Sequence, residues 1–107
     1  MNTMNDMNRE IEEIIESAGL AERLGFPTIA KSLYTRAADK QLQVGMLAKT
    51  PTARGAICQL ALVWLKKGGD YPRALIIARE LSLDESLPDS LRSGFESMVK
   101  SLESYVW

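Results

Sequence analysis

The sequence predicts an all-α protein of about five antiparallel helices. Apolar residues recur every three or four positions along most of the chain, as on one face of a helix. No segment alternates apolar and polar residues with the period of two that a half-buried strand shows. Glycine and proline interrupt the helical pattern at intervals, and 107 residues suit one domain with a modest core. We therefore expect a single helical domain over residues 1–107, made of two helix pairs and a closing helix.

The first helix pair is expected at residues 5–43, around a turn at Gly25. Its first helix carries an apolar stripe that comprises Met4, Met7, Ile11, Ile14, Ala18 and Ala21. Gly25 can take the left-handed conformation that ends a helix, and Pro27 suits the first turn of the next helix. That second helix runs to about Gln43, and residues 44–49 are either a frayed helix end or a loop.

The second helix pair is expected at residues 51–82. Thr50-Pro51 supplies a cap and a first helical residue, and Gly68-Gly69 ends the third helix. Asp70 can cap the fourth helix. A polar connection then leads to a closing helix at residues 88–105. Its apolar stripe comprises Leu91, Phe95, Met98, Val99, Leu102 and Val106.

The two turns look like copies of each other. The same 44 residues separate Gly25 from Gly69 and Ala30 from Ala74. One helix pair cannot bury its whole apolar face alone, so repeated pairs are expected to stack.

On these residues the chain resembles the tetratricopeptide repeat family, over roughly residues 11 to 86. The first copy matches the family's turn glycine, small residue, aromatic and second small residue with Gly25, Ala30, Tyr34 and Ala37. The second copy, from Gly69 to Ala74, matches the turn better. The resemblance implies stacked helix hairpins in which the first helix of each pair lines a concave groove for a protein partner.

The chain also departs from the family's pattern. Ala78 stands where an aromatic residue is usual, and Leu62 and Leu81 stand where small residues are usual. The spacing exceeds the family's repeat of about 34 residues, which implies extra residues near 42–50. An unrelated bundle with Gly-Pro turns is the alternative.

The residue types disfavour catalysis and metal binding. The chain has no histidine, the commonest general base and metal ligand, and Cys58 is its one cysteine. Glu12 and Glu16 share a helix face, but no second carboxylate-rich helix is present to complete a metal site with them. We interpret them as a solvated acidic face, and we expect a protein that is not an enzyme and has no catalytic site, metal site or cofactor.

Charge and hydropathy bear on partners and compartment. The formal net charge is -1, from 13 basic and 14 acidic side chains, whereas nucleic-acid binding needs a basic surplus. The sequence shows neither an apolar run of membrane-spanning length nor a basic stretch followed by an apolar one at its N-terminus. We expect no nucleic-acid or membrane partner and a cytoplasmic location, with which a single cysteine agrees.

The leading hypothesis is a protein-binding module, adaptor or chaperone-like protein that holds an amphipathic helix or apolar segment of its partner. The residues that the resemblance places on the groove are Glu12, Ile15, Gly19, Glu22, Ala56, Gln59, Val63 and Lys66. Ile15 and Val63 matter most, because both lie beside the apolar stripes of their helices. The competing possibility is that the closing helix covers them through Phe95 and Met98.

The alternative function is a self-associating protein, a homodimer formed through the Met4–Ala21 stripe, whose spacing suits pairing with a copy of itself. Trp107 either docks back onto the domain or contacts a partner.

Overall fold

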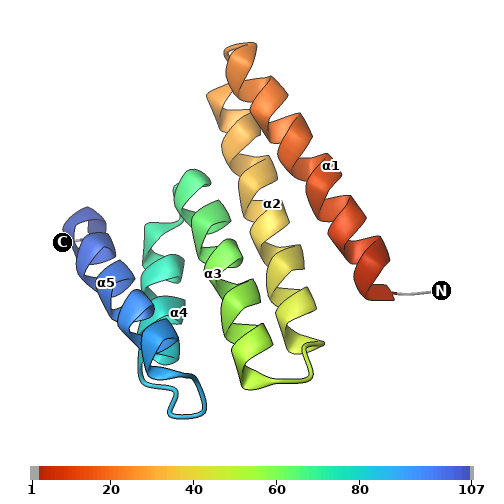
Figure 1. Cartoon of the computed structure of the whole chain (residues 1–107). Helices are drawn as coiled ribbons and strands as arrows, with labels where there is room; N and C mark the ends of the chain where they lie inside the picture. Colours follow the sequence, from red (N-terminus) through yellow and green to blue (C-terminus); the bar gives the residue numbers. More distant parts are fainter. Residues whose placement is uncertain (1–2, 107) are drawn as a thin grey trace.

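The computed structural model describes residues 3–106, which form five α-helices in antiparallel succession (Figure 1). They are α1 (Thr3–Arg23), α2 (Pro27–Met46), α3 (Pro51–Lys67), α4 (Tyr71–Ser82) and α5 (Asp89–Val106). No strand occurs within the described residues, so the all-α prediction is confirmed. Trp107, for which the sequence left two roles open, lies outside the described residues.

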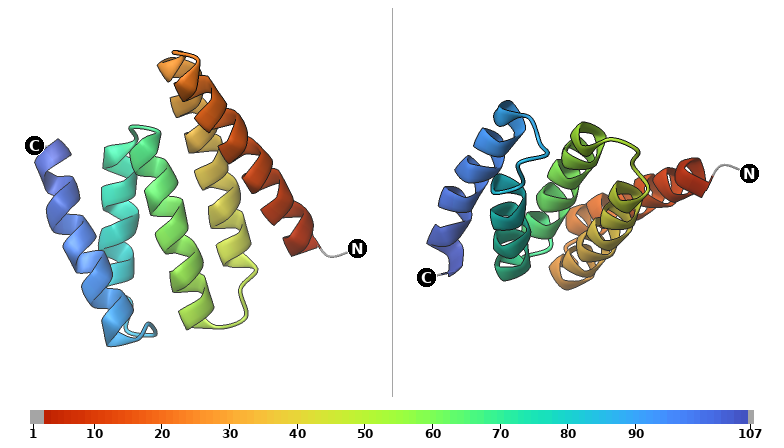
Figure 2. Two further views of the ribbon diagram at one scale, coloured as in Figure 1. Left: turned by 45° about the horizontal axis from the view of Figure 1, so that its top comes forward. Right: turned by 90° about the horizontal axis from the view of Figure 1, so that it is seen from below.

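The helices form a flat slab in which each one packs on its neighbours. α1 packs on α2, α2 on α3 and α4 on α5, while α3 makes a less extensive contact with α4 and the least extensive one with α5. The Cα atoms span 44 × 42 × 16 Å, and the thin dimension corresponds to about two helix layers. Figure 2 shows the zigzag order of the helices from below. The result is a compact five-helix bundle built from helix hairpins, which is compatible with a helical repeat fold.

Both predicted hairpin turns have the same backbone geometry. Gly25 and Gly69 adopt positive φ angles of 82° and 78°, which residues with a Cβ atom rarely take. In each turn, the amide that follows the glycine donates a hydrogen bond to the carbonyl five residues earlier. The pairs are Phe26 to Ala21, at 2.8 Å, and Asp70 to Leu65, at 3.0 Å. The 44-residue interval therefore separates two equivalent structural motifs.

The predicted caps are also present. Thr50 Oγ1 accepts a hydrogen bond of 3.1 Å from the Ala53 amide at the start of α3. Asp70 Oδ1 accepts one of 3.4 Å from the Arg73 amide at the start of α4. These side chains satisfy amides that a helix leaves unpaired in its first turn.

The apolar stripe of α1 packs within the chain. Small side chains fill the contact between α1 and α2, and Ala18, Ala21 and Ala30 are buried together with Tyr34. Ile11 is buried against α2, and Met4, Met7 and Ile14 are partly buried there. The stripe that the sequence offers for self-association is thus used by α2.

The main core lies among α3, α4 and α5. Its largest fully buried side chains are Leu62, Leu65, Phe95 and Leu102. Ala74, which the repeat pattern predicts at a helix crossing, is 0% exposed in this core, and Ala30 is 2% exposed in the smaller one.

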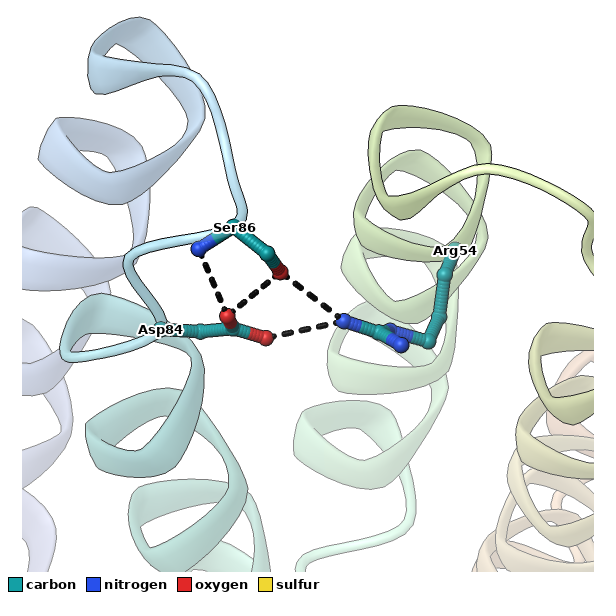
Figure 3. A network of polar contacts seen from close by, with 3 residues as sticks. All are labelled: Arg54, Asp84 and Ser86. Carbon is teal, nitrogen blue, oxygen red and sulfur yellow. Dashed lines mark hydrogen bonds and ion pairs between the residues drawn. The ribbon is translucent and has the colours of Figure 1, made fainter.

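A polar network ties the α4–α5 connection to the first turns of α3 (Figure 3). Arg54 donates to the Asp84 carboxylate at 2.9 Å and to Ser86 Oγ at 3.3 Å. Ser86 in turn donates to Asp84 from its amide, at 3.0 Å, and from its hydroxyl, at 2.6 Å. Beside the network, Leu87 is buried, and its Cδ2 atom lies 3.0 Å from where a Cβ atom on Gly55 would be. These contacts fix the base of α5 against α3.

Candidate partner-binding surface

An open depression lies where α1 crosses α2. Its volume is about 550 Å³, and two residues predicted for the groove, Ile15 and Gly19, form part of its wall. Tyr34 contributes from α2. The other lining residues are Glu16, Ser17, Leu20 and Arg23. Gly19 adds no side chain to this wall, so the depression stays open beside Ile15.

The rings of Tyr34 and Trp64 lie next to this depression and form what we name the aromatic floor. The Tyr34 ring stacks on the Trp64 ring of α3, with centroids 6.0 Å apart and planes 8° from parallel. The Nζ atom of Lys67 lies 5.3 Å from the centroid of Tyr34 and 5.8 Å from that of Trp64, within the range of cation–π attraction. The three side chains therefore join α2 to the C-terminal half of α3.

Glu22 fixes the tyrosine from the α1 side. A hydrogen bond to the Glu22 carboxylate, together with burial, raises the pKa of the Tyr34 hydroxyl above its ordinary value of 10.0. Both effects favour the neutral phenol, so the ring stays uncharged and held in place at physiological pH. Glu22 itself is exposed, and so is Glu12, which lies earlier on α1.

On α3, the sequence places only part of the surface correctly. Val63 is 37% exposed and Ala56 is exposed, as a binding face requires. Gln59, however, turns toward α5: its Nε2 atom lies 3.5 Å from where a Cβ atom on Gly94 would be. Lys66 is half-buried on the same flank of the helix. The predicted α3 set is thus divided between an open face and the flank next to α5.

Other α3 residues adjoin the aromatic floor. Leu60 is 48% exposed and lies one helical turn before Trp64, and Lys67 follows three residues later. The sequence analysis did not select these three, nor Tyr34, for the surface. The spacing of four and three residues between Leu60, Trp64 and Lys67 could have indicated this surface, because it defines a second helix face beside the buried stripe of Leu62 and Leu65.

The closing helix does not cover the α1 wall. Among the described residues, α5 packs on α4 and α3 and makes no contact with α1. Ile15 is half-buried and Val63 is exposed, so neither is enclosed in the core. We name the resulting surface the central face. It comprises Ile15, Gly19, Tyr34, Leu60, Val63, Trp64 and Lys67.

Metal-ligating side chains and the Cys58 thiol are the other candidates for chemistry among the described residues. No group of three or more His, Cys, Asp or Glu side chains among them could hold a metal ion, and no helix within residues 3–106 has the length and apolar character to cross a membrane. Burial raises the pKa of the Cys58 thiol, which disfavours its reactive thiolate form.

No family model, curated protein or solved structure matches this chain. The assignment of the central face therefore depends on its geometry and on the exposure of its side chains.

Proposed function

We propose that the protein is a non-catalytic binding module that holds an amphipathic helix or apolar segment of a protein partner on the central face. The observation that carries this proposal is an aromatic floor that lies between an open depression and two exposed aliphatic side chains. Leu60 and Val63 are 48% and 37% exposed, and neither belongs to the buried core. Apolar side chains in such a setting are typical of surfaces that a partner covers.

The charged residues at the border of the face supply the polar rim that partner surfaces usually have. Glu12 and Glu22 lie on the α1 side and Lys67 on the α3 side, while Lys66 lies on the α3 flank next to α5. A helix with apolar side chains on one face and mixed charges at its edges would complement both walls.

The fold supports a degenerate tetratricopeptide-like arrangement for this module. Two identical glycine turns lie 44 residues apart, and Ala30 and Ala74 are buried at equivalent positions. In such an arrangement α1 and α3 are the first helices of their pairs, which is where the resemblance places the partner.

Peptide binding tests the proposal without knowledge of the natural partner. The probe is a synthetic amphipathic helix with leucines at heptad positions and mixed Glu and Lys elsewhere, and its control is a scrambled peptide of the same composition. We expect the helical peptide to bind and to shift the amide NMR signals of Tyr34, Leu60 and Trp64.

A matched pair of variants locates the site. Val63→Glu places a charge on the central face and should abolish peptide binding, whereas Ile76→Glu alters a more accessible apolar residue on α4 and should not. Ile76 is 58% exposed, so both variants should fold. Equal binding of the helical and scrambled peptides, or a loss caused only by Ile76→Glu, would contradict the proposal.

A further inference from the structure

The end of the α1–α2 hairpin carries four large apolar side chains that are half exposed or more. Their exposed fractions are 49% for Leu20, 61% for Leu24, 52% for Phe26 and 54% for Ile29. They come from the last turn of α1, the connecting turn and the first turn of α2, so all four belong to the same end of the hairpin. We name these four residues the apolar tip. In Figure 1 this end of the hairpin projects beyond the α3–α4 turn.

Four basic residues lie at the same end of the molecule as the apolar tip. Arg23 and Lys31 belong to the same helix ends, and Lys66 and Lys67 end α3, where Lys67 also lies over the rings of Tyr34 and Trp64. Lys31 connects the two groups, because its Cδ atom lies 3.8 Å from where a Cβ atom on Gly69 would be. None of these four forms an ion pair with a described residue. Elsewhere, ion pairs with carboxylates engage Lys40, Arg54, Arg73, Arg79 and Arg92, whereas Arg9, Arg36, Lys49 and Lys100 form none with a described residue.

Two acidic residues also lie at these helix ends. Glu22 accepts a hydrogen bond from Tyr34, and Asp70 caps α4, but neither hydrogen bond removes the charge of the carboxylate. The four basic and two acidic side chains therefore leave this end of the molecule with a surplus of two positive charges.

We propose that the apolar tip and its basic surroundings dock on an anionic lipid surface. Apolar side chains can enter the boundary between headgroups and acyl chains, while nearby lysine and arginine side chains attract anionic headgroups. A projecting end can reach a flat surface, whereas a partner helix needs a concave site such as the central face. The contact is peripheral and involves no membrane-spanning helix.

The opposite end of the molecule shows why charge decides the orientation. Met46, Leu47 and Leu83 are also exposed there, at 83%, 50% and 78%. Asp84 and Glu85 in the α4–α5 connection balance the charges of Lys49 and Arg54, so these side chains give an anionic surface no positive surplus to attract. This end therefore supplies a matched control for the apolar tip.

The sequence analysis expected no membrane partner, because it searched for a continuous apolar run. The four residues of the apolar tip are interrupted along the chain by polar residues, a glycine and a proline, and they come to one end of the molecule only when the hairpin forms. Leu24, Phe26 and Lys31 also lie outside the central face, so variants at these positions test lipid docking separately from partner binding.

Co-sedimentation of the full chain with vesicles tests the inference. One set contains phosphatidylglycerol and phosphatidylcholine in a one-to-two ratio, and the other contains phosphatidylcholine alone. We expect binding to the mixed vesicles, much weaker binding to the neutral ones, and a decrease as salt screens the charges. Lys31→Gln should weaken binding about fivefold.

The double variant L24S/F26S should lose most of the binding, and the control double variant M46S/L47S should bind as the wild type does. Circular dichroism checks that both fold. Equal sedimentation with anionic and neutral vesicles, or equal losses in the two double variants, would overturn the inference. It would also be overturned if L24S/F26S kept vesicle binding but lost the helical peptide, because the apolar tip would then serve a protein partner.

Discussion

Replacing Gly68 with alanine should destabilise the contact between α2 and the end of α3. A Cβ atom at this position would lie 2.4 Å from Thr35 Oγ1 and 3.1 Å from both the Lys31 carbonyl oxygen and the Thr35 amide nitrogen. The hydroxyl can rotate away, but the two backbone atoms can move only if α2 and α3 separate slightly. Overpacking of this kind costs about 1–3 kcal/mol. For a domain of this size, that corresponds to a fall in Tm of about 4–12 °C.

Thermal unfolding followed by circular dichroism measures this effect, and Gly19→Ala is its control. A Cβ atom on Gly19 has an ordinary contact of 3.5 Å with the Arg23 side chain, and the position is inside α1. Alanine there should raise the stability by about 0.5–1 kcal/mol through helix propensity. If Gly68→Ala melted within about one degree of the wild type, the close approach of α2 and α3 would be wrong.

Three further predictions concern packing, capping and acid stability. Ala74→Leu should lower the free energy of unfolding by about 1–3 kcal/mol because Ala74 is fully buried, whereas Ala56→Leu at an exposed position should change it little. Urea denaturation compares the two variants, and equal stabilities would show that Ala74 does not lie at a close helix crossing. Thr50→Ala should cost about 1 kcal/mol in the same assay because the α3 cap is lost, and an unchanged urea midpoint would contradict that role. Hydrogen bonds from Ser86, with a smaller contribution from Arg54, hold the pKa of Asp84 below its ordinary value of 3.8. The Asp84 carboxylate therefore contributes its full stabilisation above that value and loses it as the pH falls through the lowered pKa. Asp84→Asn should flatten the fall of the urea midpoint between about pH 5 and pH 2, and an unchanged slope would contradict this role of Asp84.

The sequence predicted the fold well because most helix ends carry a residue that enforces them. Gly25 and Gly69 can take positive φ, and Thr50-Pro51 combines a cap with a first helical residue. The end of α2 was not predicted closely: the sequence placed it near Gln43 and left residues 44–49 as a frayed end or a loop, whereas α2 continues to Met46. Gly45 is buried inside α2, where its missing side chain gives room to Cys58: a Cβ atom there would lie 3.3 Å from the sulfur.

The candidate surface was only partly predictable. Ile15 could be selected because it lies beside the buried stripe of α1, and this reasoning is local to one helix. The direction of Gln59 depends on where α5 packs against α3, which no pattern within α3 encodes. No pattern within α3 predicts that Trp64 stacks on Tyr34 at the edge of an open depression, because this contact exists only once α2 and α3 are placed together.

Site-specific photo-crosslinking in the native host tests most directly whether the central face binds a protein partner. A photoreactive amino acid is placed at Val63 on the central face, and in a separate variant at Ile76 on α4, whose side chains are 37% and 58% exposed. The proposed function predicts a discrete crosslinked protein adduct from position 63 and none from position 76, although the second side chain is the more accessible. Adducts from position 76 alone, or the same adducts from both positions, would contradict the assignment of the central face.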